Sequence, residues 1–198
     1  MAGGIVLCGG KSTRMGSSKA LLPFGPETML QRVVRLLGEA VTPMVAVAAV
    51  DQVLPDLPAD VIVTRDEHEG RGPLEGLRAG LKAMPLHVEA AYVTSCDVPL
   101  LVPAFVRQML ELADGYDIAV MEIDGFAHPL SAVYRRATLP HIEELLASNR
   151  LRPAFLFDAV KTRRVKPAEM TADPELLTLQ NLNTPEQYAN ALARLREP

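Results

Sequence analysis

The sequence contains few of the residues that cross-link a chain or anchor it in a membrane. Only two of its 198 residues are cysteines, Cys8 and Cys96, and they form no CxxC pair. A zinc knuckle and a thioredoxin-type redox motif are therefore excluded. No apolar run approaches the ~18 residues that a membrane helix needs, and no charged region of a signal peptide follows Met1. We expect a soluble, reduced, cytoplasmic protein that does not bind membranes.

Positive charge is not in excess either. Lysine and arginine total 20 residues against 24 acidic residues, which gives a formal net charge of −4. This balance excludes a generally basic surface for nucleic acid, although it permits a local basic pocket. Hydrophobic residues make up 48% and charged residues 22% of the chain, which is typical of a folded globular protein. The length predicts a single domain over residues 1–198.

Strand-like and helix-like segments alternate along most of the chain. The predicted strands are short apolar, β-branched runs at 4–7, 43–50, 60–64, 90–94, 117–121 and 129–134. Apolar stripes at helical spacing fall at 29–37, 74–81, 105–112 and 142–146, and a last helix is predicted to begin at Thr184-Pro185. Nearly continuous apolar strands are typical of a sheet that is covered on both faces. The pattern predicts a three-layer α/β sandwich with a mostly parallel, Rossmann-like central sheet.

The loop after the first strand has the composition of a phosphate-binding site. Residues 7–22 read LCGGKSTRMGSSKALL and contain no acid. The cations and glycines of this segment are Lys11, Arg14, Lys19, Gly9, Gly10 and Gly16. Glycines let backbone N–H groups approach an anion closely, and ligands of open α/β sheets bind at the carboxyl ends of the strands. The loop is therefore predicted to hold a polyphosphate.

Two familiar phosphate motifs do not fit this loop. The Gly-Lys-Ser run at 10–12 resembles the end of a P-loop, but the first glycine of that motif would fall on Ile5, inside the strand. The dinucleotide fingerprint GxGxxG fails because Gly9 and Gly10 are adjacent and the next glycine is Gly16.

The pattern Leu-x-Gly-Gly-x-x-x-Arg-Met-Gly-x-x-Lys-x-Leu resembles the signature loop of nucleotidyltransferases that use a nucleoside triphosphate. Within that group the chain is most similar to the molybdenum cofactor guanylyltransferases. The family usually has alanine where this chain has Cys8. It also often carries an asparagine near the end of the second strand, where residues 48–51 read AAVD.

Further segments carry the same resemblance in the right order up to residue 185. Residues 72–76 read Gly-Pro-Leu-Glu-Gly and are similar to the guanylyltransferase run Gly-Pro-Leu-x-Gly, whereas the cytidylyltransferase relatives have a run with Met-Ser. Residues 96–99 match the family's Cys-Asp-x-Pro motif at the end of a strand. Residues 128–130 and 181–185 are weaker matches.

The resemblance implies a set of site residues. The nucleotide would be bound by Leu7, Cys8, Gly9, Gly10, Lys19, Asp66 and Asp97, with Arg14, Lys19 and Asp97 as the catalytic residues. Asp97 would hold Mg²⁺ on the triphosphate, although an aspartate at this place can also cap the following helix. Asp66 can accept hydrogen bonds from the guanine edge or from a ribose hydroxyl, and Glu67 is its competitor. Asn181 and Asn183 either ligate the metal or bind the pterin, or they cap the last helix.

The implied reaction transfers GMP from GTP to the molybdenum-molybdopterin cofactor, with release of pyrophosphate. The product would pass to an acceptor molybdoenzyme or its chaperone. Such a transfer needs positioning and charge neutralisation rather than a covalent nucleophile, and no Ser/His/Asp set is apparent in the sequence. Two alternatives remain: a related nucleotidyltransferase that uses CTP or a sugar phosphate, and a nucleotide-binding module without activity. The Gly-Pro-Leu run argues against the first, and the presence of Arg14, Lys19 and Asp97 together argues against the second.

Overall fold

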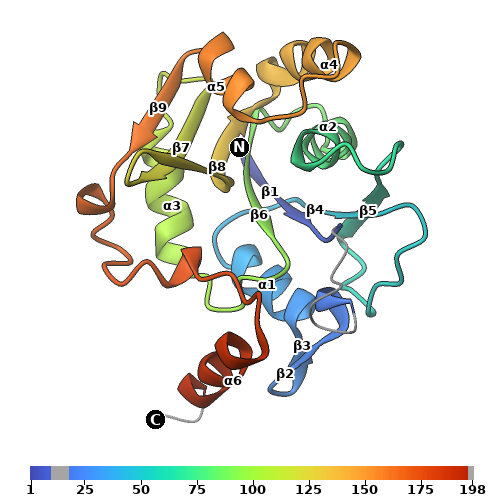
Figure 1. The fold of residues 1–198 in the computed structure, drawn as a ribbon, viewed down its shortest axis with the longest axis vertical. Helices are drawn as coiled ribbons and strands as arrows, with labels where there is room; N and C mark the ends of the chain where they lie inside the picture. Colours follow the sequence, from blue (N-terminus) through green and yellow to red (C-terminus); the bar gives the residue numbers. More distant parts are fainter. Residues whose placement is uncertain (10–17, 196–198) are drawn as a thin grey trace.

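A computed structural model describes residues 1–9 and 18–195 and shows a seven-stranded central sheet (Figure 1). The strand order is β5-β4-β1-β6-β8-β7-β9. The strands are β1 Ala2–Leu7, β4 Met44–Ala48, β5 Val61–Arg65, β6 Ala90–Ser95, β7 Ile118–Ile123, β8 Phe126–Arg135 and β9 Thr162–Val165. Neighbouring strands pair in parallel except around β8, which is antiparallel to both β6 and β7. The expected mostly parallel sheet is therefore confirmed.

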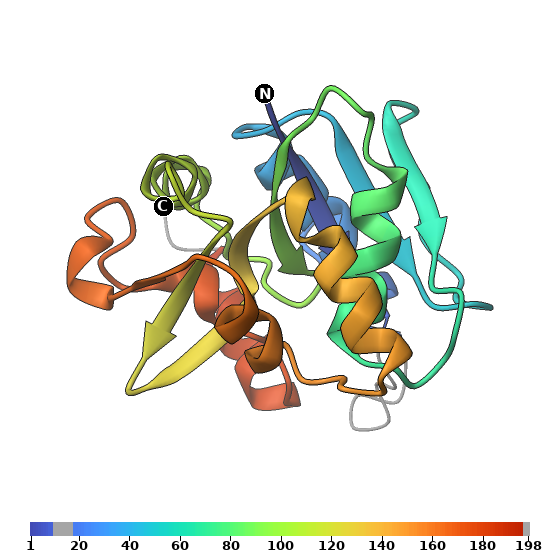
Figure 2. The same cartoon turned by 90° about the horizontal axis from the view of Figure 1, so that it is seen from above.

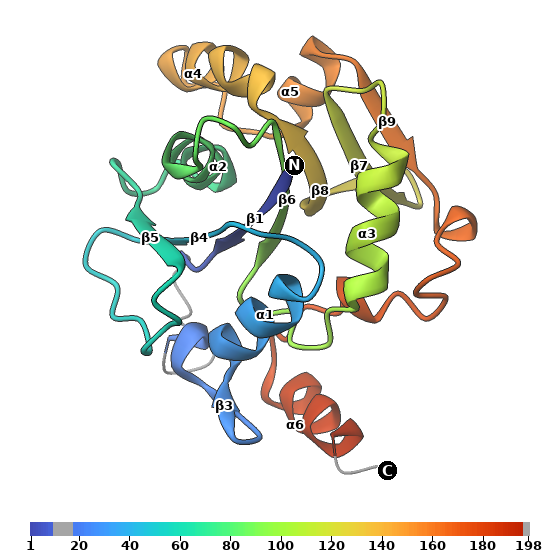
Figure 3. The same ribbon diagram turned by 180° about the vertical axis from the view of Figure 1, so that it is seen from behind.

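Helices cover both faces of this sheet. They are α1 Met29–Gly38, α2 Pro73–Ala83, α3 Pro103–Leu112, α4 Leu139–Ala147, α5 Ala154–Ala159 and α6 Pro185–Arg194. α1 and α3 pack on one face, and α2, α4 and α5 pack on the other (Figures 1 and 3). Viewed from above, α2 and α4 run side by side over the sheet (Figure 2). The three layers predicted from the sequence are confirmed.

The apolar runs explain which strands are central. Every residue of β4 is buried, and so is every residue of β1 and β6 after the first, because helices cover these strands on both faces. β5 lies at the edge of the sheet, and its positions are half-buried or exposed. All six predicted strands are present, with ends that differ by a few residues.

The antiparallel direction of β8 follows from a tight turn. Asp124 and Gly125 connect β7 to β8, and both have a positive φ, of 50° and 83°. Two consecutive positive φ values are typical of the type I′ hairpin turn, which reverses the chain direction. β8 begins at Phe126, before the predicted start at residue 129, because the hairpin carries the pairing up to this turn.

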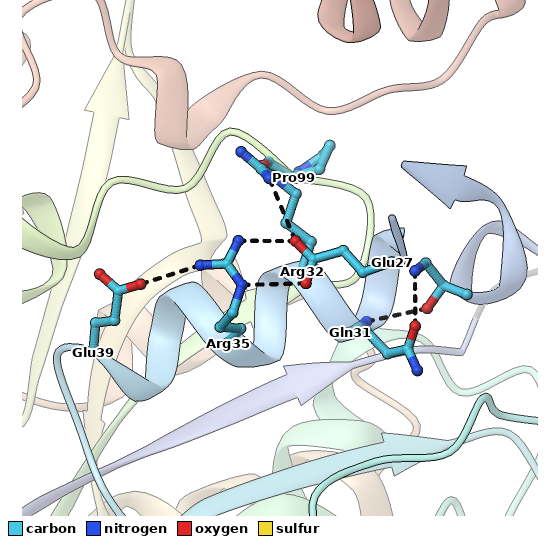
Figure 4. Close-up of polar contacts among 7 residues, drawn as sticks. Glu27, Gln31, Arg32, Arg35, Glu39 and Pro99 are labelled. Carbon is cyan, nitrogen blue, oxygen red and sulfur yellow. Dashed lines mark hydrogen bonds and ion pairs between the residues drawn. The ribbon is translucent and has the colours of Figure 1, made fainter. Parts of the chain in front are cut away.

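The start of α1 is held by polar contacts to neighbouring segments (Figure 4). Thr28 caps the helix and forms a reciprocal capping box with Gln31. Arg35 donates to the Glu27 carboxylate, with 2.8 Å from Nη2 to Oε1. Arg32 donates from Nε to the carbonyl oxygen of Pro99 at 2.7 Å. This last bond connects α1 to the loop that follows β6.

A small third core joins residues 22–29 to the C-terminal helix. The hairpin β2 (Pro23–Phe24) and β3 (Glu27–Thr28) packs against α6 (Figures 1 and 3). Phe24 and Tyr188 meet edge to face, with ring centroids 6.2 Å apart. The segment just before α6 lies at the carboxyl edge of the sheet. There the backbone N–H of Leu182 donates to the Asp97 carbonyl oxygen at 2.9 Å. Over the described part of the chain, no helix has the length and apolar character to cross a membrane.

Candidate active site

The candidate site lies where β1 and β6 end side by side. Leu7, the last residue of β1, pairs in parallel with Ser95, the last residue of β6. The backbone N–H of Cys96 continues the ladder with a 3.1 Å bond to the Leu7 carbonyl oxygen. Gly9 and Asp97 each lie two residues beyond a strand end and therefore leave the sheet at the same edge.

The two cysteines at this edge are buried. Cys8 is 4% and Cys96 5% exposed. A hydrogen bond with the Cys96 thiol, together with burial, raises the pKa of the Cys8 thiol well above its usual range. Cys8 is therefore held in its neutral form and is a poor nucleophile. Its burial agrees with a small packing residue in the position where the family has alanine.

Lys19 and Asp97 form the centre of the site. The Lys19 Nζ atom lies 2.7 Å from Asp97 Oδ2, and the two side chains are 16% and 13% exposed. Lys19 also donates to the Oδ1 atom of Asn183 at 2.6 Å. The cation and the carboxylate that the sequence assigned to phosphate and metal are thus in direct contact.

The second oxygen of Asp97 is held by two further side chains. Asn181 donates from Nδ2 to Asp97 Oδ1 at 2.9 Å. The Ser95 hydroxyl donates to the same oxygen. The helix cap before α6 is Thr184, whose side chain accepts from the Gln187 N–H. The alternative that Asn181 and Asn183 cap this helix is therefore wrong, and both side chains belong to the Lys19–Asp97 cluster.

Gln52 is a site residue that the sequence reasoning missed. Its Nε2 atom donates to the Cys8 carbonyl oxygen at 2.8 Å and lies 3.3 Å from the Ser18 hydroxyl. Its Oε1 atom accepts from the Ala49 N–H at 3.0 Å. Gln52 thereby contacts both residues that flank segment 9–17. Gln52 directly follows residues 48–51, where the asparagine that is frequent in the resembling family is missing. A side-chain amide this close to the end of the second predicted strand could have pointed to Gln52 from the sequence.

Asp66 lies on the other side of Gly9, after β5. Its carboxyl group fits between two glycines: a Cβ atom on Gly9 would lie 3.3 Å from Oδ2, and one on Gly76 would lie 3.5 Å from Oδ1. Burial, and then the charge of Glu75, raise the pKa of Asp66 to about 6, against the opposing effect of Arg78. Both glycines thus leave room for a carboxyl group at the edge of the sheet.

Glu67, the competitor of Asp66, points elsewhere. Its carboxylate pairs with Arg78 at 2.9 Å and is 56% exposed. α2 begins directly after this loop at Gly72-Pro73, and Gly72 has a φ of 68°, which favours glycine. Pro73 is the first residue of this helix, a position that tolerates proline because its N–H would have no partner within the helix.

The structure brings six of the predicted site residues to one edge of the sheet: Leu7, Cys8, Gly9, Lys19, Asp66 and Asp97. The Leu7 side chain packs in the core under α2, so only its backbone faces this edge. Gly10 and Arg14 lie outside the described residues.

The side chains around Asp97 fit a divalent cation that takes some of its ligands from the protein and the others from a bound substrate. Among the residues that the structure describes, no three His, Cys, Asp or Glu side chains cluster as a metal site. Within residues 1–9 and 18–195, Asp97 is the single carboxylate among the side chains that contact Lys19 and one another here, with amide and hydroxyl groups beside it. Mg²⁺ is commonly held by one or two carboxylates together with substrate phosphates, so this arrangement fits Mg²⁺ on a triphosphate better than a metal held by protein alone.

Comparison with known proteins agrees with this geometry. Residues 4–162 match the family model described as "MobA-like NTP transferase domain". The chain belongs to this family. It is 34% identical over 192 residues to a probable molybdenum cofactor guanylyltransferase of Carboxydothermus hydrogenoformans, with 94% of this chain and 93% of the relative covered. A relative with the same name from Mycobacterium avium is 36% identical over 197 residues, covering 98% and 95%.

Solved structures show the same fold. The molybdopterin-guanine dinucleotide biosynthesis protein A of Archaeoglobus fulgidus superposes with a TM-score of 0.78 at 19% identity, over 98% of both chains. The 2-C-methyl-D-erythritol 4-phosphate cytidylyltransferase of Thermus thermophilus superposes with a TM-score of 0.72 at 16% identity, over 100% of both chains. These two likenesses show the α/β fold. The family match and the relatives show that the protein is a nucleotidyltransferase.

The raised pKa of Asp66 predicts a cost in stability at neutral pH. A raised pKa disfavours the folded state above pH 6, and this cost disappears below the unfolded value of 3.8. The Asp66 side chain is only half-buried, so solvent screens its charge. The cost to the free energy of unfolding is therefore about 1 kcal/mol. Asp66→Asn should therefore raise the melting temperature at pH 7.5 by about 2–4 °C. Calorimetry should find this gain shrinking toward pH 4; a gain that does not depend on pH would contradict the assigned cause.

Proposed function

We propose that this nucleotidyltransferase transfers GMP from GTP to the molybdenum-molybdopterin cofactor, which releases pyrophosphate and gives the guanine dinucleotide cofactor. The contact between Lys19 and Asp97 at the carboxyl edge of the sheet carries the proposal, because it joins a cation suited to phosphate oxygens to a carboxylate suited to a divalent cation. The names of the relatives at 34% and 36% identity support the choice of base and acceptor. The product would pass in the cytoplasm to a molybdoenzyme or its chaperone.

Charge neutralisation is the main task of the site, because both reactants are polyanions. The terminal phosphate of the acceptor attacks the α-phosphorus of GTP, and the bond to pyrophosphate breaks. Lys19 and Arg14, with the N–H groups of Gly9 and Gly10, bind phosphate oxygens and stabilise the charge that develops on them. The attacking phosphate is ionised near neutral pH, so the reaction needs no general base.

Asp97 would hold Mg²⁺ in this site. The bound ion supplies charge neutralisation on the phosphate oxygens and on the leaving pyrophosphate. Asn181 and Ser95 hold the Asp97 carboxylate in a fixed orientation through its Oδ1 atom. Asn183 positions the Lys19 ammonium group beside it.

The base would be read next to α2. Guanine offers N1–H and N2–H₂ donors that adenine lacks, and the acceptors are Asp66 or the backbone carbonyl groups around Gly72 to Leu74. When ATP enters a site of this kind, a polar group of the protein loses its partner. We therefore expect GTP to be preferred over ATP by well above tenfold in kcat/KM.

A nucleotide panel tests this proposal. Turnover is measured with GTP, ATP, CTP and UTP, the purified molybdenum-molybdopterin cofactor and Mg²⁺, by following transfer of the labelled α-phosphate. Asp66→Ala should abolish the discrimination against ATP if Asp66 reads the base, and should weaken both purine nucleotides alike if it holds the ribose. Equal use of CTP and GTP by the parent would overturn the guanylyl assignment, and binding without transfer would indicate a module without activity.

A further inference from the structure

Two residues of α2 tie the loop after β5 to the helix. Glu75 accepts from the Arg78 guanidinium, with 2.6 Å from Nη2 to Oε1, and its Oε1 atom lies 3.2 Å from His68 Nδ1. Arg78 also pairs with Glu67 at 2.9 Å. Glu75 and Arg78 thus hold the two residues that directly follow Asp66, and so fix where this loop lies against α2.

Glu75 is unusual for a charged side chain because only 1% of it is exposed. It occupies the variable position of the Gly-Pro-Leu-x-Gly run, next to Gly76. Burial alone would raise the pKa of Glu75, but hydrogen bonds from His68 and Arg78 outweigh it and lower the pKa below its usual value. Glu75 is therefore a fixed negative charge at neutral pH.

Asp66 and Glu75 each have an oxygen without a partner. Asp66 Oδ1 and Glu75 Oε2 are both fully buried, and neither forms a hydrogen bond within the described part of the chain. Buried acceptors without partners cost free energy, and two neighbouring carboxylates that are shielded from water do not readily ionise together. Of the two, Asp66 is the carboxyl group that takes up a proton more readily, since burial and the charge of Glu75 raise its pKa to about 6.

We infer that Glu75 is a positioning residue for the purine nucleotide, which holds the 66–72 loop in place and controls through its charge whether Asp66 can accept hydrogen bonds from the ligand. This inference depends on the proposed binding of GTP beside Asp66. An ionised Asp66 is the better acceptor for guanine or ribose donors, whereas a protonated carboxyl group loses part of that capacity. GTP affinity should therefore fall at acidic pH, with the neighbouring charge of Glu75 setting where the fall begins.

The titratable and charged groups around Asp66 lie on α2, in the loop that follows Asp66, and at the end of β1. Glu75 and Arg78 are on α2, and Glu67 and His68 follow in the loop. Cys8 at the end of β1 is neutral, since its thiol pKa is raised. Arg78 opposes the effect of Glu75 on Asp66, so the two residues act with opposite sign on the same carboxyl group.

The experiment measures equilibrium binding of GTP with Mg²⁺ by calorimetry at pH 5 and pH 7.5. A group with a pKa of about 6 is only about one-tenth ionised at pH 5, so the parent should bind about tenfold more weakly there. Glu75→Gln keeps the shape and removes the charge, and should reduce this loss of affinity. Glu67→Gln makes the same change on an exposed partner of Arg78 and should leave the loss within about twofold of that of the parent.

A second background separates Asp66 from other titrating groups. The nucleotide phosphates also titrate in this range, but their contribution remains when Asp66 is replaced by Asn. Glu75→Gln should therefore have no effect on the pH dependence in the Asp66→Asn background, because the charge then has no carboxyl group to act on.

Three results would decide between the readings. A smaller loss of affinity in Glu75→Gln that vanishes in the Asp66→Asn background supports the inference. An equal weakening at both pH values would overturn it and would assign Glu75 a purely structural role at the start of α2. No measurable GTP binding by the parent at either pH would instead contradict the proposed function.

Discussion

Replacement of Asp97 by Asn is expected to lower turnover by about 10²-fold or more, which is the scale for losing one strong electrostatic element of an active site. The amide keeps the shape of the side chain but removes the negative charge that attracts a divalent cation. It also removes the charge that faces Lys19 at 2.7 Å. Activation by Mg²⁺ should move to higher concentration in the variant, as measured by titrating the metal at saturating GTP.

The same change at Asp114 is a matched control. Asp114 is 95% exposed after the end of α3 and lies 3.9 Å from Arg135, so Asp114→Asn should retain the parent's turnover and Mg²⁺ titration. If the titration curves of Asp97→Asn and the parent coincide, the metal role of Asp97 is wrong. The role of Asp97 would then be confined to its ion pair with Lys19.

Replacement of Lys19 by Met should weaken GTP binding and slow turnover together, with a combined loss of about 10²-fold in kcat/KM. Methionine keeps most of the length of the side chain and its apolar stem, so the lost element is the ammonium group. A phosphate contact that persists from the bound substrate to the transition state contributes to both quantities. Binding by calorimetry and single-turnover rates measure the two parts separately.

Lys82→Met serves as the control for this variant. Lys82 lies in the last turn of α2, pairs with Glu143 at 2.9 Å and is 44% exposed. An exposed pair of this kind contributes little to stability, so the control should behave as the parent does. Unchanged GTP affinity and an unchanged rate in Lys19→Met would remove Lys19 from the site.

The position of much of the candidate site was predictable, because its residues stand in short sequence motifs. Lys19 and Asp97 stand in recognisable motifs next to predicted strand ends, and parallel strands bring such ends to one edge. Gly9 was predicted as a close-approach glycine of a nucleotide site, and it leaves room for Asp66. Local pattern and position in the sheet were sufficient for these residues. The room that Gly76 leaves for the Asp66 carboxyl group was not predicted.

Other parts depended on tertiary contacts that have no local pattern. Asn183 stands next to a helix cap, so the sequence left open whether it binds the metal or the pterin or caps the helix. Its contact with Lys19 was not predicted. Gln52 lies in a loop without periodicity, and its contacts appear only when β1 and β4 are paired.

The missed elements are short or have few apolar residues. β9 spans Thr162–Val165 and reads TRRV, in which only the last residue is buried. α5 has six residues, fewer than a periodic signal needs. The reversal of β8 depends on two turn residues, whereas its apolar run does not reveal its direction.

The bond between Lys19 and Asn183 has a consequence for the order in which the protein becomes competent. It joins residues 164 positions apart, so closing this contact requires almost the whole chain to have left the ribosome. The half of the sheet formed by β5, β4, β1 and β6 is complete by Ser95, long before Asn183 is synthesised. A nascent or truncated chain can therefore form the carboxyl ends of β1 and β6 before Asn181 and Asn183 are present. It then lacks the side-chain amides that contact Asp97 and Lys19. Competence for catalysis would be acquired only at the end of synthesis, which separates the timing of folding from the timing of function.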